Sequence, residues 1–355
     1  ARVYQKAMYL AIVKVQETLD KMFGKPKQTK SALAARWTPG EHARWKNLEP
    51  IFKSYVSQLL AVASEMQDAQ TLRFLLKRIE LLVPYTRGNV RLARRLTKLA
   101  VSVWTSDTLD VNEATKLRAY LLLRCIADEP DNVEVVLRLV VKTYCGRISR
   151  ACNPRTLQNI LFAAKCIVDL FGVDMAASYT VAFAYLREMA VTLRVVLTAK
   201  ERNEQADKVH NWSFVNALRL WSMVLSTYGA ESELRPLIYP YVQIALGVMR
   251  VQPTPRTFPM RLHIASYLTD VVGATGVYIP VAAQILPLLR CKELYRKPAG
   301  GTTKDLEWRA LLRVGDDAIK TKPFLTGVVN GVMLQLSAFY SAISRHVSFP
   351  EISHG

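Results

Sequence analysis

Apolar residues recur with helical spacing along almost the whole chain, and this periodicity constrains the fold more than any other feature. One set of apolar residues steps by three and four positions and so shares one helix face: Phe183, Leu186, Ala190, Leu193 and Leu197. Short stretches containing proline or glycine, such as 128–132 and 273–276, separate the helical segments. Alternating β-branched segments bounded by hairpin dipeptides do not occur in the sequence. The sequence therefore predicts an all-α protein.

A repeat in the C-terminal half indicates how the helices are arranged. The segments "LIYPYVQIALGVM" and "VYIPVAAQILPLL" each place an aromatic residue and a proline before a run of aliphatic residues, and Pro240 and Pro280 are 280 − 240 = 40 positions apart. A period near 40 is typical of HEAT and armadillo repeats, in which helical units stack because none buries its apolar face alone. We expect a HEAT/armadillo-like helical-repeat solenoid.

Three longer segments interrupt the pattern, at about 24–42, 199–210 and 292–305. Each is rich in charged or turn-forming residues, and none resembles a linker between independently folded domains. We therefore predict one continuous α-solenoid over residues 1–355, with these three segments as exposed loops. The sequence does not begin with methionine, and we expect it to be part of a longer protein.

The chain is strongly basic, with 48 lysines and arginines against 29 acidic residues and a net charge of +19. Such a charge favours a polyanionic partner, either nucleic acid or an anionic membrane surface. The five cysteines form no CxxC motif, so we expect reduced thiols that fill the core of an intracellular protein.

Two uncharged stretches, 271–289 and 323–344, could be mistaken for membrane spans. Glycines and prolines break the first, and the second contains a GxxxG pattern at Gly327 and Gly331, a spacing found in membrane helix dimers. On a helical wheel, five polar residues of the second stretch share one face: Thr326, Asn330, Ser337, Ser341 and Ser344. Six apolar residues share the opposite face: Leu325, Val328, Val332, Leu336, Phe339 and Ile343. We predict an amphipathic helix packed against protein, and no membrane as partner.

Motifs of known chemistry are missing from the sequence. It has no GxxxxGK[ST] phosphate loop, and its five histidines show no metal-ligand spacing. Asp316 and Asp317 are adjacent, so on a helix they point in different directions and cannot face one substrate together. His263 lies in the apolar segment "FPMRLHIASYL", where we expect a packed or surface histidine. We predict that the protein is not an enzyme and has no cofactor, no metal site and no small-molecule substrate.

The clearest functional feature is the basic segment "RGNVRLARRLTKLAVSVW" at 87–104. Five cations lie within about a quarter of the helical wheel, opposite an apolar face: Arg87, Arg91, Arg94, Arg95 and Lys98. Such a stripe can contact successive phosphates without reading bases, although an ordinary solvated helix face is the alternative. No aromatic residue suited to base stacking is interleaved in it. We predict a contact with RNA or with another acidic partner.

Several stretches, in order, resemble the nucleolar complex protein 2 family of ribosome-assembly factors. They include "SYTVAFAYLREMAVTLRVVLTAK" at 178–200, "NWSFVNALRLWSMVLS" at 211–226, the long segment at 234–289, and "LLRVGDDAIKTKPF" at 311–324. The resemblance covers about residues 155–353, which we treat as family-like C-terminal repeats. Residues 1–154, the N-terminal repeats, agree only loosely, so the basic stripe is not carried over as a family site.

The resemblance implies a non-catalytic scaffold in the nucleolus and nucleus that takes part in rRNA processing and assembly of the large ribosomal subunit. The partners it implies are nucleolar complex protein 1 or protein 3, in a heterodimer, and the pre-60S particle with its precursor rRNA. We expect the apolar C-terminal half, about residues 210–350, to contact the partner protein. Two other classes remain as alternatives: a nuclear transport-receptor-like solenoid, which is usually acidic, and a basic membrane-surface adaptor.

Overall fold

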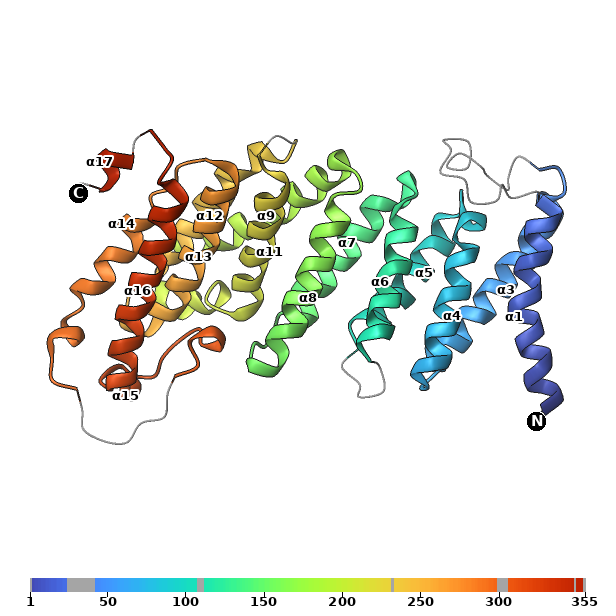
Figure 1. The fold of residues 1–355 in the computed structure, drawn as a ribbon, viewed down its shortest axis with the longest axis horizontal. Coiled ribbons are helices and arrows are strands. Elements are labelled where there is room, and N and C mark those ends of the chain that lie inside the picture. Colours follow the sequence, from blue (N-terminus) through green and yellow to red (C-terminus); the bar gives the residue numbers. More distant parts are fainter. Residues whose placement is uncertain are drawn as a thin grey trace. The chain divides into compact units, whose positions relative to one another are not determined.

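The computed structural model describes residues 2–23, 42–106, 112–230, 233–298, 306–347 and 349–353. Within these ranges the chain is built from helices joined by short turns and contains no strand, which confirms the all-α class (Figure 1). The chain forms two compact units, residues 1–140 and 141–355. The division falls inside helix α7, Val133–Thr143.

The described residues of the first unit form α-helices and two 3-10 helices. Its elements are α1 (Arg2–Phe23), α3 (Trp45–Glu65), α4 (Ala69–Leu82), η2 (Val83–Thr86), α5 (Val90–Trp104), α6 (Glu113–Ala127), η3 (Pro130–Asn132) and the first part of α7. Helix α6 packs against both α4 and α5, and α3 contacts α4 and α5. The predicted loop at 24–42 lies outside the described residues except for its last position.

An aromatic cluster fills one end of the first unit. The rings of Phe23, Trp45, Phe52 and Tyr85 pack together, with centroid separations between 5.4 and 6.3 Å. All four side chains are buried. The hydroxyl of Tyr85 donates a hydrogen bond of 2.5 Å to Asp20 Oδ1, so the polar end of the ring is satisfied on α1. This cluster joins α1, α3 and η2 into one core.

The second unit contains the longest described helix, α9, together with several very short ones. Its α-helices are α8 (Pro154–Phe171), α9 (Met175–Thr198), α10 (Arg202–Gln205), α11 (Trp212–Tyr228), α12 (Ile238–Val251), α13 (Phe258–Thr275), α14 (Val281–Ile285), α15 (Asp316–Ile319), α16 (Lys322–Ile343) and α17 (Phe349–Ser353). Its shorter elements are η4 (Tyr144–Ile148), η5 (Ala206–Lys208), η6 (Arg235–Leu237), η7 (Pro255–Thr257), η8 (Leu286–Arg290), η9 (Lys292–Tyr295) and η10 (Trp308–Ala310). Of these, η4 is a π-helical turn and the others are 3-10 helices.

Helix α13 is the centre of the second unit, because α11 packs on one side of it and α16 on another. Arg219 Nε donates to the Tyr267 hydroxyl at 2.9 Å, and Ser222 Oγ donates to the Tyr267 carbonyl oxygen at 2.7 Å, which fixes α11 against α13. On the other side, Phe258 and Leu262 pack with Phe324 and Val328 in a shared apolar cluster. The proline-containing segment that opens α13 is therefore core, as its sequence indicates.

The two proline motifs of the repeat do not build equal helices. Pro240 lies in the first turn of α12, which continues for 14 residues, whereas Pro280 caps α14, which has 5 residues. After α14 the chain continues as the 3-10 helix η8, which contains Pro287. Because proline removes a backbone donor and clashes with the preceding turn, Pro287 explains why the second helix is short.

The segment 199–210 differs from the predicted exposed loop. It folds into α10 and η5, and Val209 and His210 at its end are buried. The reason is that the His210 ring lies 3.3 Å (Nε2) from the Val248 carbonyl oxygen on α12, so the segment closes over the core. Of the third predicted loop, residues 292–295 form η9 and residues 299–305 lie outside the described part of the chain.

Helix α16 is long and apolar enough to cross a membrane by length and composition. Its packing follows the predicted amphipathic pattern in part: the five polar residues of the predicted outer face are exposed, and Val328, Val332, Phe339 and Ile343 are buried. Three further apolar residues, Val329, Met333 and Leu334, are exposed as well. Those buried residues face the protein, since α16 packs against α13. Core helices of water-soluble proteins meet the same length and composition criteria, so this helix alone is weak support for a membrane span.

Candidate nucleic-acid interface

Helix α5 carries the predicted basic stripe. The start of the helix is fixed by the two residues that precede it, Gly88 and Asn89. Gly88 has a φ of 78°, a left-handed conformation that glycine adopts without a steric penalty. Asn89 then caps the helix, since its side chain accepts a hydrogen bond of 3.2 Å from the Leu92 backbone nitrogen. The helix therefore begins at Val90, three residues later than the basic segment in the sequence.

Four cations share the exposed face of α5, and we call them the α5 stripe: Arg91, Arg94, Arg95 and Lys98. The opposite face packs into the first unit through residues that are all buried: Leu92, Leu96, Leu99 and Val103. This arrangement is the one that the periodicity predicts. With a rise of about 1.5 Å per residue, the stripe extends about 10 Å along the helix.

The cations of the stripe have few partners in the folded protein. Arg95 Nη1 donates to Ser57 Oγ on α3 at 2.6 Å. Arg91, Arg94 and Lys98 form no side-chain hydrogen bond and no ion pair with any residue that the structure describes, and α5 itself contains no acidic residue. The charge of these three side chains is therefore available to an external anion.

Arg87 does not belong to this face. It precedes the helix, and its Nε lies 2.6 Å from Glu129 Oε2 in an ion pair whose side chains are only 15% and 14% exposed. Gly88 and Asn89 form the turn between Arg87 and the first residue of α5, so Arg87 lies outside the helix and does not share its face. The expectation that Arg87 shares the stripe is thus corrected, and its role is to join the start of α5 to the turn after α6.

His263 is a structural residue. Its Nε2 lies 3.1 Å from the Leu311 carbonyl oxygen, and its ring packs beside that of Trp212 at 5.7 Å. Burial lowers the pKa of His263 to about 4, so the ring is neutral at physiological pH. Neither a carboxylate nor a cysteine approaches it among these contacts, and the described residues contain no group of three or more potential metal ligands.

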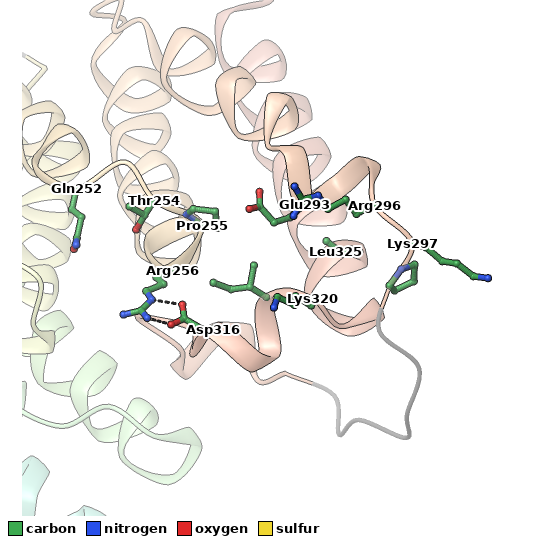
Figure 2. Close-up of a pocket in the computed structure, with 12 residues that line it drawn as sticks. Gln252, Thr254, Pro255, Arg256, Glu293, Arg296, Lys297, Asp316, Lys320 and Leu325 are labelled. Carbon is green, nitrogen blue, oxygen red and sulfur yellow. Dashed lines mark hydrogen bonds and ion pairs between the residues drawn. The ribbon is translucent and has the colours of Figure 1, made fainter.

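A cavity of about 750 Å³ opens between η7, η9, α15 and α16, and Figure 2 shows the residues that line it. At one edge Arg256 forms a two-pronged ion pair with Asp316, and both side chains are more than half exposed. Lys297 points away from the other labelled side chains (Figure 2). Asp316 is therefore held by an arginine, and its described neighbours in the cavity include no histidine or cysteine to form a nucleophile and base pair.

These features define an all-α protein that presents an exposed cationic helix face on α5. The chain belongs to the Noc2p family, whose model matches residues 131–354. This confirms the resemblance seen in the sequence. The match also begins before residue 155, so the family-like part includes α7 and the turn that follows it.

Relatives from plants, fungi and insects are similar over most of the chain. It is 32% identical over 355 residues to nucleolar complex-associated protein 2 of Arabidopsis thaliana, which covers 99% of this chain and 46% of that protein. It is 32% identical over 316 residues to an uncharacterized NOC2 family protein of Schizosaccharomyces pombe, covering 86% and 44%. Nucleolar complex protein 2 of Drosophila melanogaster is 26% identical over 358 residues, covering 99% and 45%.

The comparisons bear on three properties of the chain: the share of its relatives that it spans, its N-terminal part, and its location. The chain spans less than half the length of these curated relatives. The alignments to the plant and insect proteins cover 99% of this chain, so they include the N-terminal part, whereas the family model begins at residue 131. The names of the plant and insect relatives confirm the predicted nucleolar location.

Proposed function

We propose that this chain is a non-catalytic scaffold in assembly of the large ribosomal subunit, and that it binds precursor rRNA or the pre-60S particle through the α5 stripe. Membership of the Noc2p family and the nucleolar names of its relatives support a role in ribosome biogenesis. The observation that carries the proposal is the set of three stripe cations without a partner among the described residues. Their spacing along one face suits successive phosphates of an RNA strand.

The proposal includes a continuous HEAT/armadillo-like solenoid and a heterodimer with nucleolar complex protein 1 or protein 3. The packing of α6 against α4 and α5 in the first unit, and of α13 against α11 and α16 in the second, supports a repeat architecture. Apolar residues exposed on α16, Met333 and Leu334 above all, support a protein interface in the second unit.

The stripe is tested by charge reversal. Changing Arg91, Arg94 and Lys98 to glutamate removes three phosphate contacts, so RNA affinity should fall and the salt dependence should flatten by about 0.7 to 0.9 logarithmic units per contact. The measurement is the RNA dissociation constant by fluorescence anisotropy at several salt concentrations. Co-sedimentation with pre-ribosomal particles tests the same change in a nuclear extract.

A matched control reverses three exposed cations elsewhere: Arg187, Arg194 and Lys200. This variant has the same net charge as the stripe variant, so it separates a local contact from a general effect of charge. A second control, Arg87→Ala, should lower the free energy of unfolding by about 1.5 to 3 kcal/mol because it leaves Glu129 unpaired, and it should leave the salt slope unchanged. Equal losses in the stripe variant and the charge-matched control would rule out the stripe as the RNA contact. Wild-type binding to anionic vesicles that the stripe variant loses, with no binding to RNA, would favour the membrane-surface alternative.

A further inference from the structure

A second basic segment outside the α5 stripe is a run of sequence without acidic residues. Between Glu134 and Asp169 the chain has six basic residues and no acidic one. In the structure this run forms most of α7, the π-helical turn η4 and most of α8. It also falls within the part of the chain that matches the family.

The exposed side of α8 combines three kinds of side chain. Between the exposed Pro154 at its start and the exposed Asp169 near its end, five exposed residues share this side, and we call them the α8 face: Arg155, Gln158, Asn159, Phe162 and Lys165. Their positions span about 120° of the helical wheel. Along the helix axis a cation lies at each end, the two amides follow the first cation, and the aromatic ring comes before the second cation. From Arg155 to Lys165 the face extends about 15 Å along the axis.

The α8 face is held rigidly toward solvent. Asn153 and Thr156 form a capping box at the start of the helix, since the Asn153 side chain accepts from the Thr156 backbone nitrogen at 2.9 Å and the Thr156 hydroxyl accepts from the Asn153 nitrogen at 3.0 Å. The opposite side of α8 is buried through Ile160, Ala164 and Ile167. The helix therefore cannot rotate to bury the face.

The side chains of the α8 face are free to bind a ligand. Arg155 and Lys165 are exposed and form no side-chain hydrogen bond or ion pair with a described residue, and the same holds for the Gln158 and Asn159 amides. Phe162 is 36% exposed, and its ring stacks on no other described ring. Two more exposed arginines, Arg147 and Arg150, lie on the turn that leads into the helix.

This combination differs from the α5 stripe, which contains cations but no aromatic ring. Cations bind phosphates of any polyanion, whereas an exposed ring between them offers a stacking platform for an unpaired base. Amide side chains beside the ring can pair with base edges. Arginine outnumbers lysine here, and its planar guanidinium suits bidentate phosphate contacts.

We infer that the α8 face binds single-stranded RNA, with Arg155 and Lys165 on phosphates and a base stacked on Phe162. The inference rests on the proposed RNA-binding function and adds to it a second surface that prefers unpaired strands. An acidic polypeptide is the competing ligand for the same cations, but it has no flat ring system to stack on Phe162.

The experiment uses the full chain and two RNA probes, a fluorescein-labelled single-stranded oligouridylate and an RNA duplex of the same length. Phe162→Leu keeps an apolar side chain but removes the ring, so oligouridylate binding should weaken about fivefold to a hundredfold with an unchanged salt slope. Phe162→Trp should retain the affinity. The Arg155→Gln, Lys165→Gln double variant should instead flatten the salt slope by about 1.4, which is about 0.7 for each phosphate contact on a single strand. Duplex binding should be insensitive to Phe162→Leu, because its bases are stacked within the helix.

The matched control carries the same changes on α9, where Phe183 is also exposed but stacks on Tyr179 at 6.0 Å: Phe183→Leu with Arg187→Gln and Arg194→Gln. It should bind oligouridylate more tightly than a variant that combines Phe162→Leu with both glutamine changes on α8. Thermal unfolding checks that every variant is folded.

Four other outcomes would overturn the inference, each in a different way. If wild type binds RNA and the α8 variants bind it equally well, the α8 face is not an RNA surface, while the proposed function of the α5 stripe stands. If Phe162→Leu has no effect but the charge variant does, the face is not specific for single strands. If polyglutamate binds wild type as tightly and loses affinity equally on Phe162→Leu, the ligand is an acidic protein segment. If wild type binds neither RNA probe, the RNA-binding part of the proposed function fails together with the inference.

Discussion

Gly327 and Gly331 of α16 lie where neighbouring side chains approach the helix backbone. A Cβ atom on Gly331 would lie 2.6 Å from Leu262 Cδ1, and a Cβ on Gly327 would overlap the indole ring of Trp308. The GxxxG spacing that resembles a membrane-helix dimer motif is thus explained by packing within the second unit. Both contacts join α16 to other parts of the same unit.

We predict that Gly327→Ala destabilises the protein by about 1 to 3 kcal/mol, because the indole ring is rigid and must shift to make room. Gly331→Ala should cost less, since the end of the Leu262 side chain can change rotamer. The measurement is the free energy of unfolding from urea denaturation. Gly273→Ala on α13 is the control, because its Cβ would make only an ordinary contact of 3.5 Å with Ala342 and should gain helix propensity. A Gly327→Ala protein as stable as wild type would contradict the close packing of Trp308.

His263 gives the stability of the protein a pH dependence. Burial, with a smaller contribution from the positive charge of Arg219, lowers the pKa of His263 to about 4, whereas a histidine in the unfolded chain titrates near 6.5. Between these values the unfolded state binds more protons than the folded state, so this contribution is fully present above about pH 6.5 and is lost as the pH falls toward 4. Burial also lowers the pKa of His210, which acts in the same direction.

We expect the free energy of unfolding to fall by about 2 kcal/mol between pH 7.5 and pH 5 on account of His263. His263→Phe should remove most of this fall while it costs some stability at pH 7.5 through the lost contact with the Leu311 carbonyl. Urea denaturation at several pH values measures both effects, and the exposed His346→Phe is the matched control. An identical pH profile in His263→Phe and wild type would show that the ring is not buried.

At the scale of single elements, the sequence predicts helices and their buried faces well because both follow from local periodicity. The apolar faces of α5 and α16 are buried as their spacing indicates. Boundaries are harder, since a cap depends on one or two residues: Gly88 and Asn89 move the start of α5 past Arg87. The ion pair of Arg87 with Glu129 joins positions 42 residues apart, so no local pattern reveals it.

The candidate binding surfaces were predictable to different degrees. Four members of the α5 stripe follow from helical spacing, but the bond of Arg95 to Ser57 depends on how α3 and α5 pack. The α8 face has a sequence signal in its run without acidic residues, yet the exposure of Phe162 depends on packing of the opposite side of the helix. Charge patterns in the sequence therefore identify a candidate surface. The packing of the helices then decides which of its side chains are exposed and have no partner within the protein.

At the scale of the whole molecule, the second unit exposes apolar side chains that its own core does not cover. On α16, Val329 is 41% exposed and Met333 is 58% exposed, and they lie one helical turn apart on the same flank. The partly exposed Leu336 and Tyr340 continue this flank toward the end of the helix. A flank of this kind is typical of a protein interface, and it lies in the half of the chain where we expect the partner.

We predict that this flank docks the proposed partner, nucleolar complex protein 1 or protein 3, in an interface that buries on the order of 2,000 Å². Changing Val329 and Met333 to glutamate places two charges in the apolar centre, so co-expression and affinity purification should recover little or no heterodimer. The matched control places glutamates at Ser337 and Ser341 on the exposed polar face of the same helix, and it should pair normally. Normal pairing of the Val329, Met333 variant would locate the interface elsewhere. Loss of pairing in both variants would indicate that added negative charge, rather than the apolar flank, disrupts the complex.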